Sequence, residues 1–91
     1  MIIANRKMNG TSENVKIWIE KVSNNIDIKP EKVCVFCPPA CYLEFARDLI
    51  RKQKTQIKLG SQIINSCHDK ALTGGLSATM LRDIDTDFVL I

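Results

Sequence analysis

Two polar residues near the start of the chain, Asn5 and Lys7, have the types and the spacing to hold an anionic substrate. They follow an apolar run at residues 1–4 and precede a turn at residues 9–12. A lysine ammonium attracts phosphate or carboxylate as a point charge, and an asparagine amide nearby can hydrogen-bond the same ligand. The spacing indicates a candidate anion site, and a solvated strand end is the alternative interpretation.

Cysteine and histidine side chains are the second group that could do chemistry. Cys34-x-x-Cys37 has the spacing of a redox or metal pair, and Cys41, Cys67 and His68 could supply further ligands. Residues i and i+3 of a strand point to opposite faces, so the two thiols of an apolar strand would diverge. We therefore predict buried apolar cysteines, a solvated His68 and no metal site.

A glycine-rich stretch at residues 73–75, Thr73-Gly74-Gly75, precedes a short helical pattern. Backbone N–H groups in such a stretch could form an anion-binding nest. The stretch lacks the spacing of a phosphate-binding P-loop, so the motif alone is weak evidence.

Composition limits the classes of function. The chain has 91 residues, of which 45% are hydrophobic and 25% charged, which is ordinary for one small globular domain. A net charge of +3 is too small to indicate nucleic acid. The basic run at residues 47–58 has no interleaved aromatic residues, so we interpret it as the solvated end of a helix.

The sequence contains no signal peptide and no apolar stretch near the roughly 20 residues that a membrane span needs. With four cysteines and no secretory signal, we expect a reduced, cytoplasmic setting and no membrane partner. We expect no cofactor.

Apolar periodicity predicts an alternating order of strands and helices. Apolar runs at residues 1–4, 33–37, 57–60 and 88–91 predict buried strands, and the unbroken run at 33–37 favours a strand covered on both faces. Helices are predicted after residue 12, at about 40–54, and after a Ser77 cap. The first carries an apolar stripe at helical spacing in which Trp18 is a core residue: Val15, Trp18, Ile19, Val22.

Strand-helix repeats of this kind give a parallel α/β sheet with right-handed crossovers. In such sheets the chemistry gathers at the carboxyl ends of the strands. That edge is where the pattern places Asn5, Lys7, Cys37, Pro38 and Gln62.

Five segments of the chain resemble one enzyme family in order and in spacing. They are "ANRKMNGT", "VCVFCPPACYLEFARDLI", "IKLGSQ", "ALTGGLSATMLRDI" and "DFVLI". Together they look like the N-terminal part of triosephosphate isomerase. The resemblance implies a partial (β/α)8 barrel, in which residues 1–91 are one incomplete barrel segment with the first three βα units and the fourth strand.

The resemblance also implies roles for particular residues. Lys7 matches the lysine that contacts the substrate phosphate and supports the charge of the enediolate, and Asn5 matches an asparagine that hydrogen-bonds the substrate. Thr73, Gly74 and Gly75 match the tip of a loop that inserts beside the partner's active site in the family homodimer. Met8 lies in the region against which that loop packs.

Three positions depart from the family pattern. Arg6 stands where the family usually has an aromatic residue, which puts the local packing in doubt. Ile63 replaces an asparagine, and Gly75 replaces a glutamate that helps to hold the dimer together. We therefore expect a weakened interface.

The family interconverts D-glyceraldehyde 3-phosphate and dihydroxyacetone phosphate, in glycolysis and gluconeogenesis. Its catalytic histidine and glutamate belong to segments beyond those matched here, so we expect a truncated homologue that is inactive alone. One alternative is the N-terminal half of a split isomerase that another, complementary chain completes. Another is a non-catalytic module that binds phosphate or a partner.

The first and fourth strands of such a segment would be open edges of the sheet. Side chains that face the inside of a barrel would have no opposing layer, which leaves apolar area in water. We therefore expect the isolated chain to be marginally stable, or to aggregate or self-associate.

Overall fold

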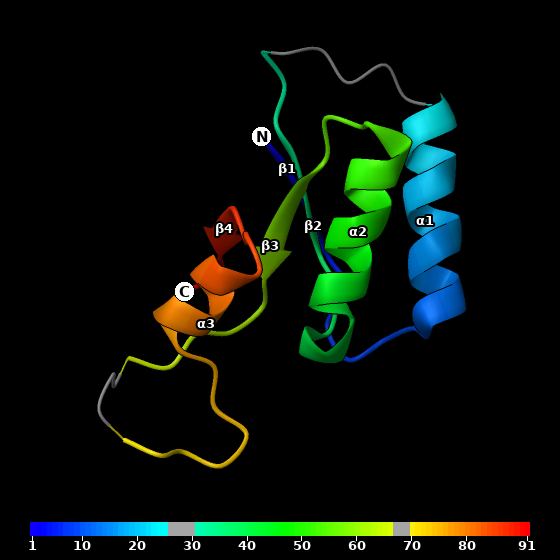
Figure 1. Cartoon of the computed structure of the whole chain (residues 1–91). Helices are drawn as coiled ribbons and strands as arrows, with labels where there is room; N and C mark the ends of the chain where they lie inside the picture. The colour runs from blue at the N-terminus through cyan, green and yellow to red at the C-terminus, as the bar shows by residue number, and fades with distance from the viewer. Residues whose placement is uncertain (26–30, 67–69) are drawn as a thin grey trace.

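Four parallel strands form the centre of the computed structural model, which describes residues 1–25, 31–66 and 70–91 (Figure 1). The strands lie in the order β1-β2-β3-β4, so neighbours in the sheet are also neighbours in the chain, as predicted. Their bounds are β1 Ile2–Asn5, β2 Cys34–Cys37, β3 Lys58–Ser61 and β4 Phe88–Val89.

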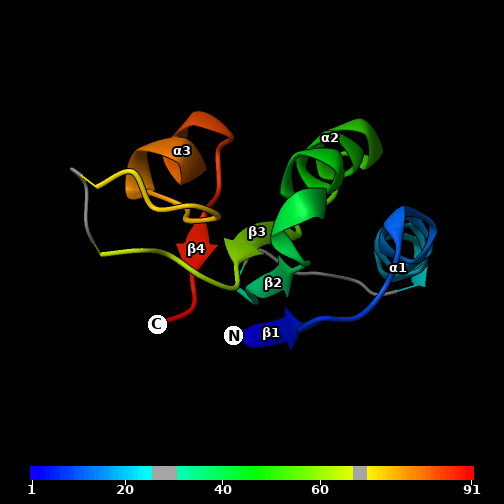
Figure 2. The ribbon, with the colours of Figure 1, turned by 90° about the horizontal axis from the view of Figure 1, so that it is seen from below.

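Helical segments follow each of the first three strands along the chain. They are α1 Ser12–Asn25, the short 3-10 helix η1 Ala40–Tyr42, α2 Leu43–Gln53 and α3 Ala78–Asp83. Figure 2 shows α1, α2 and α3 on the same side of the sheet. No helix in the described ranges covers the opposite face, so the sheet has a packed face and an open face. None of these helices has the length and apolar character that crossing a bilayer requires.

Helix α1 packs on the sheet through the predicted apolar stripe. Val15 and Ile19 are buried, and the Trp18 ring stacks on the Phe36 ring of β2 with centroids 4.3 Å apart. The interpretation of Trp18 as a core residue is therefore confirmed. The stripe works because residues three and four apart lie on one face of a helix.

Side-chain caps begin two of the helices. The Thr11 backbone N–H donates to Asn14 Oδ1 (3.2 Å) while the Asn14 N–H donates to Thr11 Oγ1 (3.3 Å), a reciprocal cap at the start of α1. The predicted Ser77 cap is confirmed, because Ser77 Oγ accepts from the Met80 N–H at 3.1 Å. These caps fix where the chain leaves the carboxyl edge of the sheet and enters each helix.

The hydrophobic core lies between the packed face of the sheet and the three helices. Phe36 of β2 and Leu59 of β3 are its sheet side, and α2 contributes Leu43 and Ala46. The predicted burial of the strand at 33–37 is confirmed for Val35, Phe36 and Cys37, although the layer of described helices covers only one of its faces (Figure 2).

The prediction that the first and fourth strands are buried is wrong. In β1, Ile3 is 47% exposed, and in β4, which has two residues instead of the expected four, Phe88 is 38% exposed. Each of these strands has a hydrogen-bonded neighbour on one side only, and the open face has no layer against it. The expectation that they form the two edges of the sheet is confirmed.

Gly60 of β3 allows the strands to approach closely on the open face. A Cβ atom at this position would lie 2.6 Å from Cys37 Sγ and 2.8 Å from Val35 Cγ1. No real side chain tolerates such contacts, so the buried state of Val35 and Cys37 depends on a glycine in the adjacent strand.

Candidate functional site

The carboxyl ends of β1, β2 and β3 are tied together by one side chain, that of Gln62. Its Nε2 donates to the Lys7 carbonyl and to the Cys37 carbonyl, both at 2.9 Å. The Arg6 N–H also donates to the Cys37 carbonyl (3.1 Å). The predicted gathering of Asn5, Lys7, Cys37 and Gln62 at this edge is therefore confirmed.

Lys7 is held in a left-handed backbone conformation, with φ of 54°. Its N–H donates to Asn5 Oδ1 at 2.8 Å, and its carbonyl is the acceptor for Gln62. A residue with a Cβ pays about 1–2 kcal/mol to adopt this conformation. The two hydrogen bonds hold the strained backbone, and strain of this kind clusters at functional sites.

Asn5 and Lys7 present free donors at this edge. The side-chain oxygen of Asn5 accepts from the Lys7 N–H, so the amide nitrogen Nδ2 is the atom of Asn5 that remains available to a ligand. Within residues 1–25, 31–66 and 70–91, no acceptor bonds Asn5 Nδ2 and no carboxylate pairs with the exposed Lys7 ammonium. One amide donor and one cation are suited to a phosphate or carboxylate oxygen.

Arg6 points toward the turn that leads into α1. Its Nη2 lies 3.8 Å from the position that a Cβ of Gly10 would occupy, and its carbonyl accepts from Asn9 Nδ2 at 3.1 Å. Gly10 has φ of 103°, which a residue with a side chain rarely adopts. The half-buried arginine thus packs against the turn at residues 9–11.

The loop that carries Thr73 is fixed at its base by Asn65. Asn65 Oδ1 accepts from the Leu76 N–H (2.7 Å), and the Asn65 N–H donates to the Leu76 carbonyl (2.8 Å). Figure 1 shows residues 70–77 projecting away from the sheet. The residue-type pattern gave no signal for Asn65 beyond its place in a polar loop.

The tip of this loop is a tight turn. The Gly75 N–H donates to the Leu72 carbonyl at 3.0 Å, and Gly74 has φ of 77°. A Cβ on Gly75 would lie 3.1 Å from Leu72 Cβ, so this turn leaves little room for the glutamate of the family pattern. Thr73 and Gly74 are exposed, Met8 is 95% exposed, and no hydrogen bond in the described ranges joins this turn to Lys7.

The cysteines of the second strand are poor candidates for thiol chemistry. Burial raises the pKa of the Cys34 thiol and of the Cys37 thiol, which disfavours the reactive thiolate. Cys41 is exposed. The described ranges contain no group of three His, Cys, Asp or Glu residues that could hold a metal. Cys67 and His68, named above as further ligands, lie outside the described residues.

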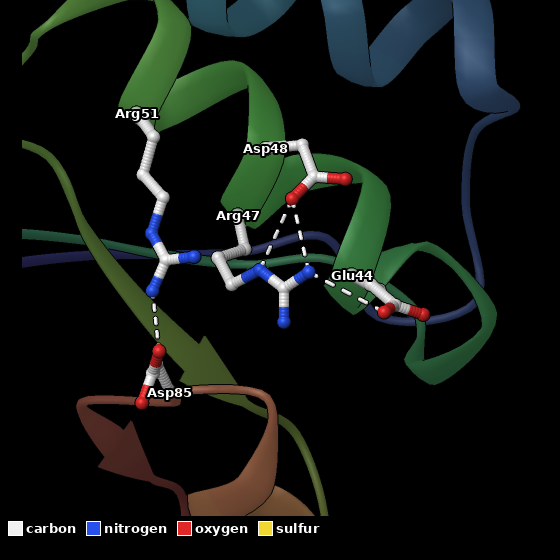
Figure 3. A network of polar contacts seen from close by, with 5 residues as sticks. All are labelled: Glu44, Arg47, Asp48, Arg51 and Asp85. Carbon is white, nitrogen blue, oxygen red and sulfur yellow. Dashed lines mark hydrogen bonds and ion pairs between the residues drawn. The ribbon is translucent and has the colours of Figure 1, made fainter.

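A charged network joins α2 to the turn before β4 (Figure 3). Arg47 bridges Glu44 (3.3 Å) and Asp48 (3.0 Å), and Arg51 pairs with Asp85 in the turn before β4. The hydrogen bond to Asp48 raises the pKa of Arg47. The interpretation of this basic run as a solvated helix end is therefore wrong for Arg47, whose side chain is only 17% exposed.

Replacing Gln62 with leucine should destabilise the chain by about 1–3 kcal/mol, because the Lys7 carbonyl loses its side-chain donor and the Cys37 carbonyl keeps only the Arg6 N–H. Urea denaturation monitored by circular dichroism measures this change. Gln56→Leu is the control, since Gln56 is exposed and its replacement should change stability by at most about 0.5 kcal/mol. Equal effects of the two substitutions would show that the Gln62 bonds do not hold the three strand ends.

Comparisons with known proteins give one consistent result. The family model described as Triosephosphate isomerase matches residues 1–91. Triosephosphate isomerase of Neurospora crassa is 33% identical over 96% of this chain and 34% of its own length. The Zygosaccharomyces bailii enzyme is 32% identical over the same shares, and that of Chlamydia muridarum is 35% identical over 99% of this chain and 33% of its own. The chain spans about a third of the length of these curated relatives.

Proposed function

We propose, because the chain belongs to the triosephosphate isomerase family, that its 91 residues supply the phosphate-contacting part of an isomerase site. The chain corresponds to the N-terminal portion of that family, and its parallel four-stranded sheet agrees with the first units of a (β/α)8 barrel. Lys7 and Asn5 would contact triose phosphate. The observation that carries the proposal is the strained Lys7 backbone, held by Asn5 and Gln62 at the carboxyl edge.

The chemistry of the reaction limits what this half-site can do alone. Moving a proton between adjacent carbons needs a positioned base, and the developing enediolate needs electrophilic stabilisation. The Lys7 ammonium can attract phosphate, but it has no lone pair with which to take a proton from carbon. We therefore propose that these 91 residues by themselves do not turn over triose phosphate.

The open sheet favours one second candidate, the N-terminal half of a split isomerase. The apolar residues Ile3 and Phe88 remain exposed on the two edge strands, where further barrel units from another chain could pair. In this candidate the other chain supplies the base and the electrophile, while Lys7 keeps its role toward phosphate.

The proposal extends to contact with a partner subunit and to the cellular location of the protein. The projecting turn with Thr73 and Gly74 would contact a partner subunit near Met8, as the family resemblance implies, and Gly75 would weaken that contact because it brings no carboxylate. Free cysteines at positions 34, 37 and 41 support a reducing, cytoplasmic location. The reaction would then serve glycolysis and gluconeogenesis.

An isomerase assay of the purified 91-residue chain tests the proposal. The assay is made with and without a separately produced C-terminal portion of a related barrel. We expect no turnover by the chain alone and measurable turnover in the mixture. Turnover by the chain alone would overturn the proposal of inactivity. No turnover in a mixture whose two parts are shown to bind would overturn the role of Lys7 and Asn5.

Calorimetry with inorganic phosphate separates a non-catalytic binding module from these candidates. Phosphate binding by the chain alone that Lys7→Ala abolishes, combined with an inactive mixture, would favour the binding module.

A further inference from the structure

The open face of the sheet and its two edges carry much of the exposed apolar surface. Of the eleven large hydrophobic side chains that are exposed in the described ranges, five lie in or beside the two edge strands. They are Met1, Ile2, Ile3, Phe88 and Ile91. Figure 2 shows both chain ends on the side of the sheet away from the helices. Parallel sheets normally have both faces covered, so this face lacks a layer.

The surface area of the chain agrees with a missing layer. The chain exposes 6394 Å², whereas area scaling gives about 5,400 Å² for a folded monomer of 10.3 kDa. The excess is about 1,000 Å², and a standard interface removes about 800 Å² from each partner. An interface of ordinary size can therefore be built on the open face.

Free backbone donors line the outer edge of β1. The Ile2 N–H donates to the Val33 carbonyl and the Arg6 N–H to the Cys37 carbonyl, so this set of amides faces β2. Hydrogen-bonding directions alternate along a parallel strand, so the amides of Ile3 and Asn5 face the free edge. Such an edge pairs readily with another parallel strand.

We propose that the open face binds a second copy of this chain, so that two four-stranded sheets close into one eight-stranded parallel barrel. A twofold axis along the barrel would place β4 of each copy beside β1 of the other. A second copy offers both required edges at once, in parallel orientation, together with a matching apolar face. Eight strands are also the number at which side chains fill a barrel of this kind.

This dimer differs from the one that the family resemblance implies. The family contact uses the loop tip at Thr73 and the region of Met8, whereas the closed barrel uses Ile3 and Phe88. It also does not depend on Lys7, so Lys7→Ala should leave the dimer intact. Failure of the dimer and failure of the proposed isomerase role are therefore distinguishable.

Sedimentation velocity of the purified chain at several concentrations tests the proposal, with Phe88→Asp as the disrupting variant. We expect a wild-type dimer, and a dissociation constant raised by roughly 100-fold or more in the variant, because each dimer would bury the new carboxylate twice. Phe45→Asp is the matched control. Phe45 is also 38% exposed but lies on α2, so its replacement should leave the dimer unchanged.

Three results would overturn the proposal: a monomer at every concentration, open-ended polymers, or a dimer that Met8→Asp dissociates and Phe88→Asp does not. Should Phe88→Asp lose its circular dichroism spectrum, amide hydrogen exchange of the wild-type chain decides. Protection of the Ile3 and Asn5 amides that rises with protein concentration supports the closed barrel. Protection that is independent of concentration overturns it.

Discussion

Replacing Lys7 with alanine lowers the isomerase activity of the complemented mixture by about 10²- to 10³-fold, the usual effect of losing one group that stabilises transition-state charge. Two of residues 5–7 are cationic, Arg6 and Lys7, and Arg6 packs toward Gly10. The substitution therefore removes the cation of this segment that is left to contact phosphate. Steady-state kinetics of the mixture, with kcat and KM measured separately, provide the test.

Lys54→Ala is the matched control for this substitution. Lys54 is also an exposed lysine with a left-handed backbone, at φ of 51°, but it ends α2 just before β3 begins, near the amino edge of the sheet. Both variants lose one positive charge and keep the same backbone conformation. Equal losses of activity in the two variants would mean that overall charge, and not the place of Lys7, governs activity.

Lys7→Gly separates a functional role from a structural one. Glycine adopts the left-handed conformation without the Cβ clash, so this variant should be more stable toward urea by about 1 kcal/mol. The bonds from Asn5 and Gln62 involve only the Lys7 backbone and remain available. A gain in stability together with a loss of activity is the pattern of a residue kept for function. A loss of stability would indicate that the lysine side chain supports the fold.

Local patterns predicted those features of the fold that depend on spacing along one element. The stripe that contains Trp18 gave the packed face of α1, and Ser77 gave the start of α3, because both depend on residues within one or two helical turns. The alternation of elements predicted a parallel sheet with right-handed connections, and the family resemblance implied the order of its strands.

Features that depend on distant neighbours were missed or only placed approximately. Apolar composition predicted buried outer strands, but burial of Ile3 and Phe88 requires a layer that no described element supplies. The sequence placed Gln62 at the correct edge, yet its side chain bonds to Lys7, which is 55 positions earlier in the chain, and to Cys37, which is 25 positions earlier. No local pattern reports such contacts, so the structure was needed to identify Gln62 as the residue that joins three strands.

Replacing Phe36 with alanine should unfold much of the chain. Phe36 is fully buried at the centre of the core, and truncation of such a residue costs about 3–5 kcal/mol. The stack on Trp18 adds about 0.5–1.5 kcal/mol. Domains of this size have roughly 5–14 kcal/mol of total stability, and a sheet with one uncovered face belongs at the lower end. Urea denaturation followed by the fluorescence of Trp18, the single tryptophan, measures the loss.

The control for Phe36 is Phe45→Ala, which removes the same side chain from the outer surface of α2. Because Phe45 is already 38% exposed, its truncation leaves a smaller cavity and should cost about 1 kcal/mol or less. Comparable losses in both variants would contradict a core centred on β2. If the core is centred there, the packed face of the sheet holds the Lys7 site in place even while the opposite face stays open, because Gln62 ties Lys7 to the carboxyl end of the same strand.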